Sequence, residues 1–254
     1  MFNHIKQITK NKFSGILAFG DTHSDYDSFI RVYEYAKDNN LFFMSLGDLV
    51  DRGEHPFEVV SLMHKAIEEG AGGMVIGNHD DKFYRYGMGN KVRLSGDAKA
   101  TLDHVGSHRM SDFLQMYINV VNKSSYFSVL DDIIFTHGAT HESMWDTSVN
   151  FTSEAKYRAL YGEVTGEHYP DGYPIRYYGW ADDVPIGRTA IVGHDRAPIH
   201  NELIAEPLTY QNSKGGKVIF MDTGGGKGGH ITGVILNNDS GKYEVDKFVD
   251  FKPA

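Results

Sequence analysis

LFFMSLGDLVDRG, residues 41–53, passes from an apolar run into a segment of glycine, aspartate and arginine. The apolar run has the length and composition of a buried β-strand, and Gly47 marks its end. The polar motif GDLVDRG, residues 47–53, therefore starts at the carboxyl end of a predicted strand. In open α/β sheets, ligands bind beyond that end of the strands.

The same arrangement recurs at four further places: ILAF before GDTH at 16–23, MVI before GNHD at 74–80, IIFT before HG at 133–138, and AIV before GHD at 190–195. A single histidine after a strand is most often a capping or packing residue. Five strand ends that carry carboxylate, imidazole or carboxamide groups are much less expected by chance. We therefore expect these side chains to meet in one site.

The remaining pattern predicts a single layered α/β domain over residues 1–254. Helical spacing predicts helices over 27–38 and 57–69, and a longer helix over 98–121. Short strands are predicted over 126–130, 133–136, 189–192, 217–221 and 231–236. The order strand, loop, helix, strand indicates right-handed βαβ units. Residues 161–183, rich in Gly, Pro and Tyr, are predicted to form an ordered loop insertion over the site.

Composition narrows the chemistry. The 254 residues include no cysteine, so disulfides, thiolate metal sites and cysteine nucleophiles are excluded. The net charge of −9 argues against a broad nucleic-acid-coating surface. No run approaches the ~20 apolar residues that span a membrane, and the first residues lack the apolar core of a signal peptide. We expect a cytoplasmic protein with no membrane contact.

The polar residues suit a pair of metal ions. A mixture of oxygen and nitrogen donors without sulfur is what Mn²⁺ or Fe²⁺ prefers. Two ions ~3.5–4 Å apart need one shared carboxylate, with terminal ligands on either side. Asp48, which lies between the earlier and later clusters, is the natural bridge. Asp21 and His23 are two positions apart, so both can face one ion from an extended segment.

GDTH, GDLVDRG and GNHD, followed by two later histidines, resemble the phosphoprotein-phosphatase branch of the calcineurin-like binuclear metallophosphoesterases. The resemblance implies a four-layer αββα sandwich of two mixed sheets with helices outside. It implies two divalent ions, Mn²⁺ first, with Fe, Zn, Ni or Co as alternatives. The ligands that it implies are Asp21, His23 and Asp48 on one ion, and Asp48, Asn78, His137 and His194 on the other. It also implies Arg52 as a phosphate clamp, and His79, paired with Asp51, as the acid that protonates the leaving oxygen.

A second resemblance concerns the substrate. LYGEVTGE at 160–167, YPIRY at 173–177 and MDTG at 221–224 are similar to the phosphatase domain of bacterial polynucleotide kinase-phosphatase. This implies hydrolysis of phosphate monoesters, with diesters as an extension, at nucleic-acid 2′ or 3′ ends or on nucleotides. Arg176 and Tyr177 are the predicted substrate contacts. An RNA-repair kinase or ligase encoded separately is the predicted partner.

Three alternatives stay open. A serine/threonine phosphatase would act on phosphoproteins, and a diadenosine tetraphosphatase on a phosphorylated small molecule. Asp80 stands where the wider family has glutamate, a change that is also seen in the symmetrical diadenosine tetraphosphatases. A catalytically dead metal-binding interaction module would not need Asp51, Arg52 and His79. The glycine-rich GGGKGG, residues 224–229, lacks the order of a nucleotide-binding phosphate loop and is predicted to be a turn beside the site.

Overall fold

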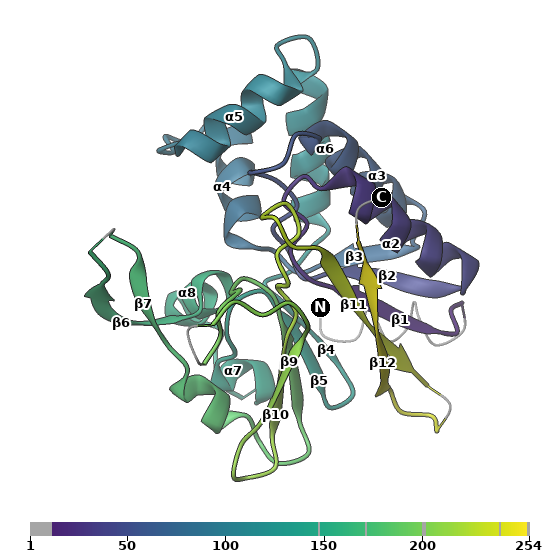
Figure 1. The fold of residues 1–254 in the computed structure, drawn as a ribbon, viewed down its shortest axis with the longest axis vertical. Helices are drawn as coiled ribbons and strands as arrows, with labels where there is room; N and C mark the ends of the chain where they lie inside the picture. The colour runs from purple at the N-terminus through teal and green to yellow at the C-terminus, as the bar shows by residue number, and fades with distance from the viewer. Residues whose placement is uncertain (1–11, 147, 171, 200–201, 239, 253–254) are drawn as a thin grey trace.

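The protein, seen as a computed structural model, is described for residues 12–252 except 147, 171, 200, 201 and 239. Two five-stranded mixed sheets face each other in this part of the chain, and helices cover their outer sides (Figure 1). The first sheet has the order β12-β11-β1-β2-β3, and the second has the order β4-β5-β8-β10-β9. The predicted αββα arrangement of two mixed sheets is confirmed.

The strands of the first sheet are β1 Gly15–Phe19, β2 Leu41–Ser45, β3 Gly72–Met74, β11 Ile231–Asn237 and β12 Glu244–Phe251. Those of the second are β4 Phe127–Leu130, β5 Ile133–Thr136, β8 Thr189–Val192, β9 Leu208–Gln211 and β10 Lys217–Phe220. The helices are α2 Tyr26–Asp38, α3 Pro56–Glu68, α4 Asn78–Gly87, α5 Gly96–Val105, α6 Met110–Asn122, α7 Glu142–Trp145 and α8 Ser153–Tyr161.

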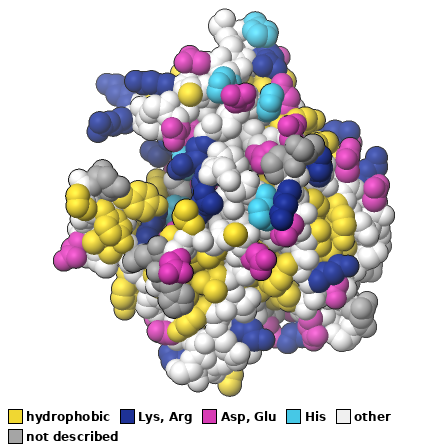
Figure 2. Space-filling view, in the orientation of Figure 1, with side chains coloured by type: hydrophobic (Ala, Val, Ile, Leu, Met, Phe, Trp, Pro, Cys, Tyr) yellow, Lys and Arg dark blue, Asp and Glu magenta, His cyan; other side chains and the backbone are white. Residues whose placement is uncertain are grey.

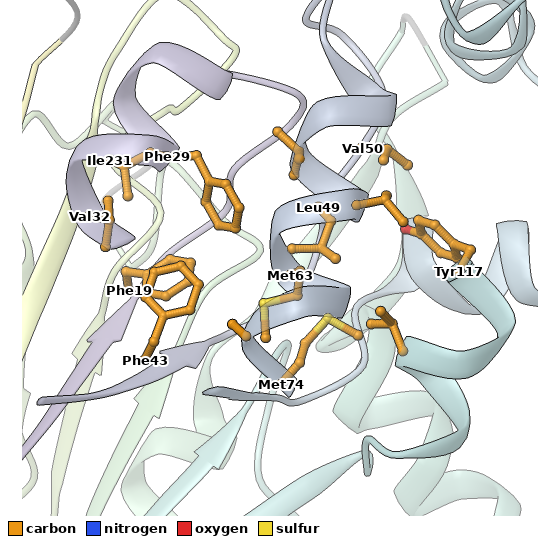
Figure 3. Packing of buried hydrophobic residues seen from close by; sticks show 14 of the residues in the cluster. Phe19, Phe29, Val32, Phe43, Leu49, Val50, Met63, Met74, Tyr117 and Ile231 are labelled. Atoms are coloured by element: carbon orange, nitrogen blue, oxygen red, sulfur yellow. The ribbon is translucent and has the colours of Figure 1, made fainter. Parts of the chain in front are cut away.

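Strand β1 contributes to two hydrophobic cores because successive side chains of a strand point to opposite faces. Leu17 and Phe19 join the core beneath α2 and α3, together with Phe43 and Met63 (Figure 3). Ile16 and Ala18 instead join the core between the two sheets. Burial of each large apolar side chain contributes roughly 1.5–3 kcal/mol. The two sheets thus share an interior layer.

The helices over the first sheet start where local chemistry favours a start. Asp25 caps α2 by accepting a hydrogen bond from Ser28 N at 3.1 Å. Pro56 is the first residue of α3, where a missing N–H costs little. The outer side of the second sheet is covered by α7, α8 and the short 3₁₀ helix η1, Gly179–Asp183. No helix of the described residues is both long and apolar enough to cross a bilayer.

Parallel pairing places the carboxyl ends of several strands at one edge. β1 and β2 are parallel in the first sheet, and β5, β8 and β10 are parallel in the second. The polar motifs follow these strands directly, so segments more than a hundred residues apart in the chain meet at this edge. This confirms the arrangement expected from the strand-end pattern.

Two predictions about elements were wrong. The single helix predicted over 98–121 is two helices, α5 and α6, because Gly106 ends α5 at a φ of 73°. Residues 161–183 are not a loop, since they contain the hairpin β6–β7, with β6 Glu163–His168 and β7 Pro174–Tyr177, and then η1. Strands β9 and β12 were not predicted. The single domain over 1–254 stays a prediction.

Candidate active site and metal centre

Asp48 lies at the centre of the converging strand ends. Its Oδ2 is 3.3 Å from His137 Nε2 and 3.8 Å from His23 Nε2. Its Oδ1 accepts a hydrogen bond of 2.9 Å from the backbone N–H of His79. The carboxylate is 3% exposed, so it is shielded from water and directed at both histidines. This is the position that a bridging ligand requires.

The histidine rings are held so that a ring nitrogen faces Asp48. Nδ1 of His23 lies 2.8 Å from the carbonyl oxygen of Val50, and Nδ1 of His137 lies 2.8 Å from that of Leu46. A hydrogen bond from Nδ1 to a carbonyl leaves the lone pair of Nε2 free for a metal. Nε2 of His23 and Nε2 of His194 are buried and have no hydrogen-bond partner in the described chain. The orphaned Nε2 of His23, which faces Asp48, fits a metal ion.

The other predicted ligands complete the cluster. Asp21 Oδ2 lies 3.4 Å from His23 Nε2, while Asn78 Oδ1 lies 3.2 Å from His137 Nε2. His194 Nδ1 is 3.1 Å from that same nitrogen of His137. The structure thus brings all six sequence-predicted ligands together. Donor atoms within 4.8 Å of one another form two groups, which are His23, Asp48 and His79, and Asp48, His137 and His194. Asp48 belongs to both groups.

The charge states of His23, His194 and Asp48 suit metal binding, whereas His137 must lose a proton before it can bind an ion. Burial lowers the pKa of His23 and of His194, which keeps both rings neutral, as a ligand must be. Burial would raise the pKa of Asp48, but the charges of His137 and His79 outweigh it and hold this pKa well below its usual range. Burial likewise opposes the charged form of His137, yet Asp48 raises the pKa of His137 to about 9.

The loops around the centre adopt left-handed backbone. Of nine described non-glycine residues with positive φ, six lie here: His23, Ser24, Asp48, Asp51, Arg52 and His194. Each such residue costs roughly 1–2 kcal/mol relative to ordinary backbone. Leu49 and Val50, inside the GDLVDRG motif, are fully buried in the core (Figure 3) and hold that motif in place. Packing therefore stabilises the strained loop.

Asp80 ties the GDLVDRG loop to the start of α4, where the GNHD motif lies. Its Oδ2 accepts hydrogen bonds of 2.8 Å from the backbone N–H groups of Asp48 and Gly77. Its Oδ1 accepts from Leu49 N at 3.1 Å and from the Tyr117 hydroxyl at 2.6 Å. The carboxylate is fully buried and uses both oxygens on these four donors. Asp80 therefore holds the ligand-bearing segments in place and is not itself a metal ligand.

His79 is held by Asp51, as the sequence predicted. The His79 Nδ1 atom and Asp51 Oδ2 form a short hydrogen bond, and Thr101 and Lys82 donate to the same carboxylate at 2.7 and 2.6 Å. Burial would raise the pKa of Asp51, but His79 and Lys82 outweigh it and lower this pKa to about 2. Thr101 and Lys82 were not predicted. His79 Nε2 lies 3.8 Å from Asp48 Oδ2, at the margin of the metal cluster.

A cavity of about 390 Å³ opens beside the cluster. Its lining includes four cationic side chains, from Arg52, Arg176, Arg196 and Lys227, and the rings of Tyr161 and Tyr173. Figure 2 shows Lys and Arg side chains next to the hydrophobic β6–β7 hairpin, which projects from the body as Figure 1 shows.

The hairpin places the two predicted substrate contacts differently. Arg176 lines the cavity and donates hydrogen bonds to the carbonyl of Tyr161 and, at 3.0 Å, to the Tyr173 hydroxyl. Tyr177 does not line this cavity. Its hydroxyl lies against Gly179 instead, where an added methyl group would be only 2.2 Å from the hydroxyl oxygen. The tyrosine beside the cavity is Tyr173, which is 51% exposed. Substrate contact by Tyr177 stays a prediction.

Two further residues of the site, Asp222 and Lys227, were also not predicted from sequence. Asp222 follows β10 as the other polar residues follow their strands, and that position was the available signal. Burial and the nearby Asp21 charge raise the pKa of Asp222 to about 7. Lys227 belongs to the GGGKGG segment, which does form a turn beside the site, but its side chain enters the cluster.

A two-sheet αββα fold with a carboxylate-bridged cluster of Asp, His and Asn at its strand ends defines a metal-dependent phosphoester hydrolase. The calcineurin-like phosphoesterase family matches residues 15–221, and the chain belongs to this family. The motif-based prediction of the family and of a phosphoester hydrolase is thereby confirmed. The finer resemblance to polynucleotide kinase-phosphatase stays a prediction.

Curated relatives support this membership. The chain is 29% identical over 230 residues to the asymmetrical bis(5′-nucleosyl)-tetraphosphatase PrpE of Bacillus velezensis. The aligned region covers 84% of this chain and 85% of the relative. It is 30% identical over 192 residues to the protein of the same name from Bacillus subtilis strain 168, with 74% and 72% covered.

Solved structures agree on the fold. A putative diadenosine tetraphosphatase matches with a TM-score of 0.58 at 15% identity, covering 96% of both chains. A protein serine/threonine phosphatase from Saccharomyces cerevisiae matches with a TM-score of 0.53 at 15% identity, covering 97% of this chain and 82% of its own. At these identities the likeness shows the fold alone.

Proposed function

We propose that two divalent ions, Mn²⁺ in first place, bind around Asp48 and enable hydrolysis of a phosphate ester in the adjoining cavity. The observation that carries this proposal is the placement of Asp48 Oδ2, 3.3 and 3.8 Å from the ring nitrogens of His137 and His23, which come from different sheets. Bound ions would supply Lewis acidity, which stabilises negative charge on a phosphate.

The chain's own residues supply the remaining chemistry. Arg52 is exposed to the cavity, and its forked guanidinium suits two oxygens of a phosphate. His79, oriented by Asp51 through Nδ1, directs Nε2 at the cluster and donates a proton to the leaving oxygen. Because Asp51 stays anionic, it stabilises the protonated ring that this step needs.

Replacement of the bridging carboxylate tests the metal centre. Asp48→Asn keeps the shape of the side chain but removes the charge that two ions would share. We expect bound Mn²⁺ to fall below two equivalents and kcat to fall by at least ~100-fold. Metal content by mass spectrometry and turnover of p-nitrophenyl phosphate measure the two effects. Full activity of the wild-type protein in chelator would contradict the proposal.

For the substrate we propose a dinucleoside polyphosphate. Three guanidinium groups, from Arg52, Arg176 and Arg196, line the cavity of about 390 Å³, and together they suit several phosphates better than a single one. Tyr161 and Tyr173 stand at the same cavity, where a base can stack for ~1–3 kcal/mol. The printed names of the relatives, bis(5′-nucleosyl)-tetraphosphatases, support the same class.

A nucleic-acid 2′ or 3′ terminal phosphate is the second candidate. The half-exposed ring of Tyr173 at the cavity edge favours it, because a base of a longer strand can reach that ring. The predicted kinase or ligase partner belongs to this candidate. In either case we propose a cytoplasmic location.

A Tyr173 variant distinguishes these nucleotide substrates from a phosphoprotein substrate. Tyr173→Ala should lower kcat/KM for diadenosine tetraphosphate by about 10-fold, through loss of stacking, and leave p-nitrophenyl phosphate unchanged. Tyr177→Ala, which removes a ring from the same hairpin outside the cavity, is the matched control. The panel also contains a 3′-phosphorylated oligonucleotide and a phosphoserine peptide, all with Mn²⁺. A peptide that is the best substrate, with no effect of Tyr173→Ala, would make a protein phosphatase the better assignment.

A further inference from the structure

The side chain of Lys227 enters the metal-ligand cluster as a second kind of cation. Its Nζ lies 3.1 Å from Asp21 Oδ2 and 2.7 Å from Asp222 Oδ2. Both carboxylates are completely buried, and the lysine side chain is only 11% exposed. Asp21 Oδ2 is the same oxygen that lies 3.4 Å from the orphaned Nε2 of His23. The ammonium therefore contacts a donor atom of the proposed metal centre.

The GGGKGG segment holds this lysine in place. A Cβ at Gly226 would lie 2.2 Å from the carbonyl oxygen of His23, and one at Gly225 would lie 2.5 Å from that of Asp21. Only glycine allows so close an approach to the ligand-bearing segment. The backbone of Lys227 is also fixed, since its N–H donates to Gly224 O at 2.9 Å and its carbonyl accepts from Arg196 at 2.8 Å. The fold therefore directs the ammonium at Asp21.

The two sides of the centre differ in this respect. The group Asp48, His137 and His194 has no lysine or arginine within hydrogen-bond distance of its donor atoms in the described chain. On the Asp21 side, an ammonium contacts a carboxylate that an ion would need. Like charges a few ångströms apart in a buried site repel strongly, because little water screens them.

We propose that Lys227 is a tethered cation that competes with one of the two divalent ions for Asp21, while Asp222 holds the ammonium in place. The two metal positions are then unequal. The ion between Asp48, His137 and His194 binds tightly, whereas the ion on the Asp21 side must displace the ammonium and binds weakly. This inference rests on the proposed binuclear centre. It adds a regulatory property, because occupancy of the weaker site would depend on the free metal concentration.

Lys227→Met tests the competition, because methionine keeps most of the length of the side chain but removes the charge. Mn²⁺ binding by calorimetry and by electron paramagnetic resonance should show one tight and one weak site in the wild-type protein. In the variant, affinity at the weak site should rise at least about tenfold, and the tight site should be unchanged. Lys214→Met, on an exposed lysine that pairs with Asp183, is the control and should change neither site.

The outcomes separate the two proposals. If the wild-type protein binds no Mn²⁺, the binuclear centre itself is wrong. If it binds two ions and Lys227→Met leaves or lowers the weaker affinity, the competition is wrong.

A measurement on the unaltered protein keeps the test valid if the variant does not fold. Pulse acetylation followed by mass spectrometry reports how accessible each lysine is. Saturating Mn²⁺ should increase labelling of Lys227, since the displaced ammonium moves into the cavity. Lys82, held at 2.6 Å by Asp51, should not change and serves as the internal control. No increase at Lys227 with two ions bound would overturn the inference.

Discussion

At the scale of single residues, Asp51 shows how a buried charge is kept. Its carboxylate is completely shielded from water, yet Thr101, Lys82 and His79 all bond to it. These partners favour the charged form by more than burial disfavours it, and the pKa falls to about 2. A carboxylate in this state stabilises the fold as well as orienting His79.

Asp51→Asn should therefore destabilise the protein in a pH-dependent way. The pKa of Asp51 is about 2 in the folded protein and ~3.9 when unfolded, so its charge contributes roughly 2 kcal/mol to the free energy of unfolding at pH 7. This contribution is present above about pH 4 and is lost as pH falls toward 2. Urea unfolding in chelator, from pH 7 down to pH 3, measures the difference between wild type and variant. A difference that stays constant over this range would contradict the assignment.

At the scale of elements, α6 supports the site from a distance. Tyr117 lies on α6, and its hydroxyl reaches Asp80, whose carboxylate binds the N–H groups of two ligand-bearing loops. Phe83 and Phe113 pack around the tyrosine ring. The helix thus carries one polar group into an otherwise apolar core.

Tyr117→Phe should remove that bond and preserve the packing. A hydrogen bond to a charged group contributes ~1.5–3 kcal/mol, so we expect a loss of about that size in the free energy of unfolding by urea. Tyr84→Phe is the control, because the Tyr84 hydroxyl bonds to the uncharged Asn122 at 3.1 Å across the same pair of helices. Its loss should be under ~1 kcal/mol. Equal losses in the two variants would show that Asp80 does not depend on the α6 contact.

The same scale shows how much could be predicted from sequence. Strands β1, β2, β5 and β8 were predictable because each is a continuous apolar run that stops at polar residues. Strand β12 was not predictable, since its first five side chains are exposed and the sixth, Val249, is half-buried. An exposed edge strand lacks the alternation that reveals a half-buried one. The hairpin strand β6 is likewise mostly exposed, so the sequence predicts a loop there.

The residues of the candidate site were likewise predictable only where an apolar strand leads directly to them. His137 and His194 were predictable because a strand leads directly to each. Lys227 was not, because its function depends on where a glycine-rich turn passes in space, and no periodicity in the sequence encodes that contact. Asp80 differs again, since the sequence shows its unusual residue type, but its role as an acceptor for three backbone N–H groups depends on segments that meet only in the fold.

At the scale of the whole molecule, charge is unevenly distributed. The chain carries a net charge of −9, yet four cationic side chains line a cavity beside the ligand cluster. An acidic body repels nucleic acid and phosphates in general, and a local basic cavity attracts a small anion that fits it. This distribution suits a compact polyphosphate better than an extended polyanion.

The ligand cluster also joins the two halves of the interior. Asp21 and Asp48 follow strands of one sheet, and His137 and His194 follow strands of the other. Ions bound by both pairs would therefore cross-link the two sheets. Sliding or separation of the sheets would then require metal release, and each tenfold rise in free-metal concentration above the dissociation constant would add about 1.4 kcal/mol to the free energy of unfolding. A cell that withdraws the metal would therefore loosen the protein along this seam and expose it to proteolysis, as well as silencing it.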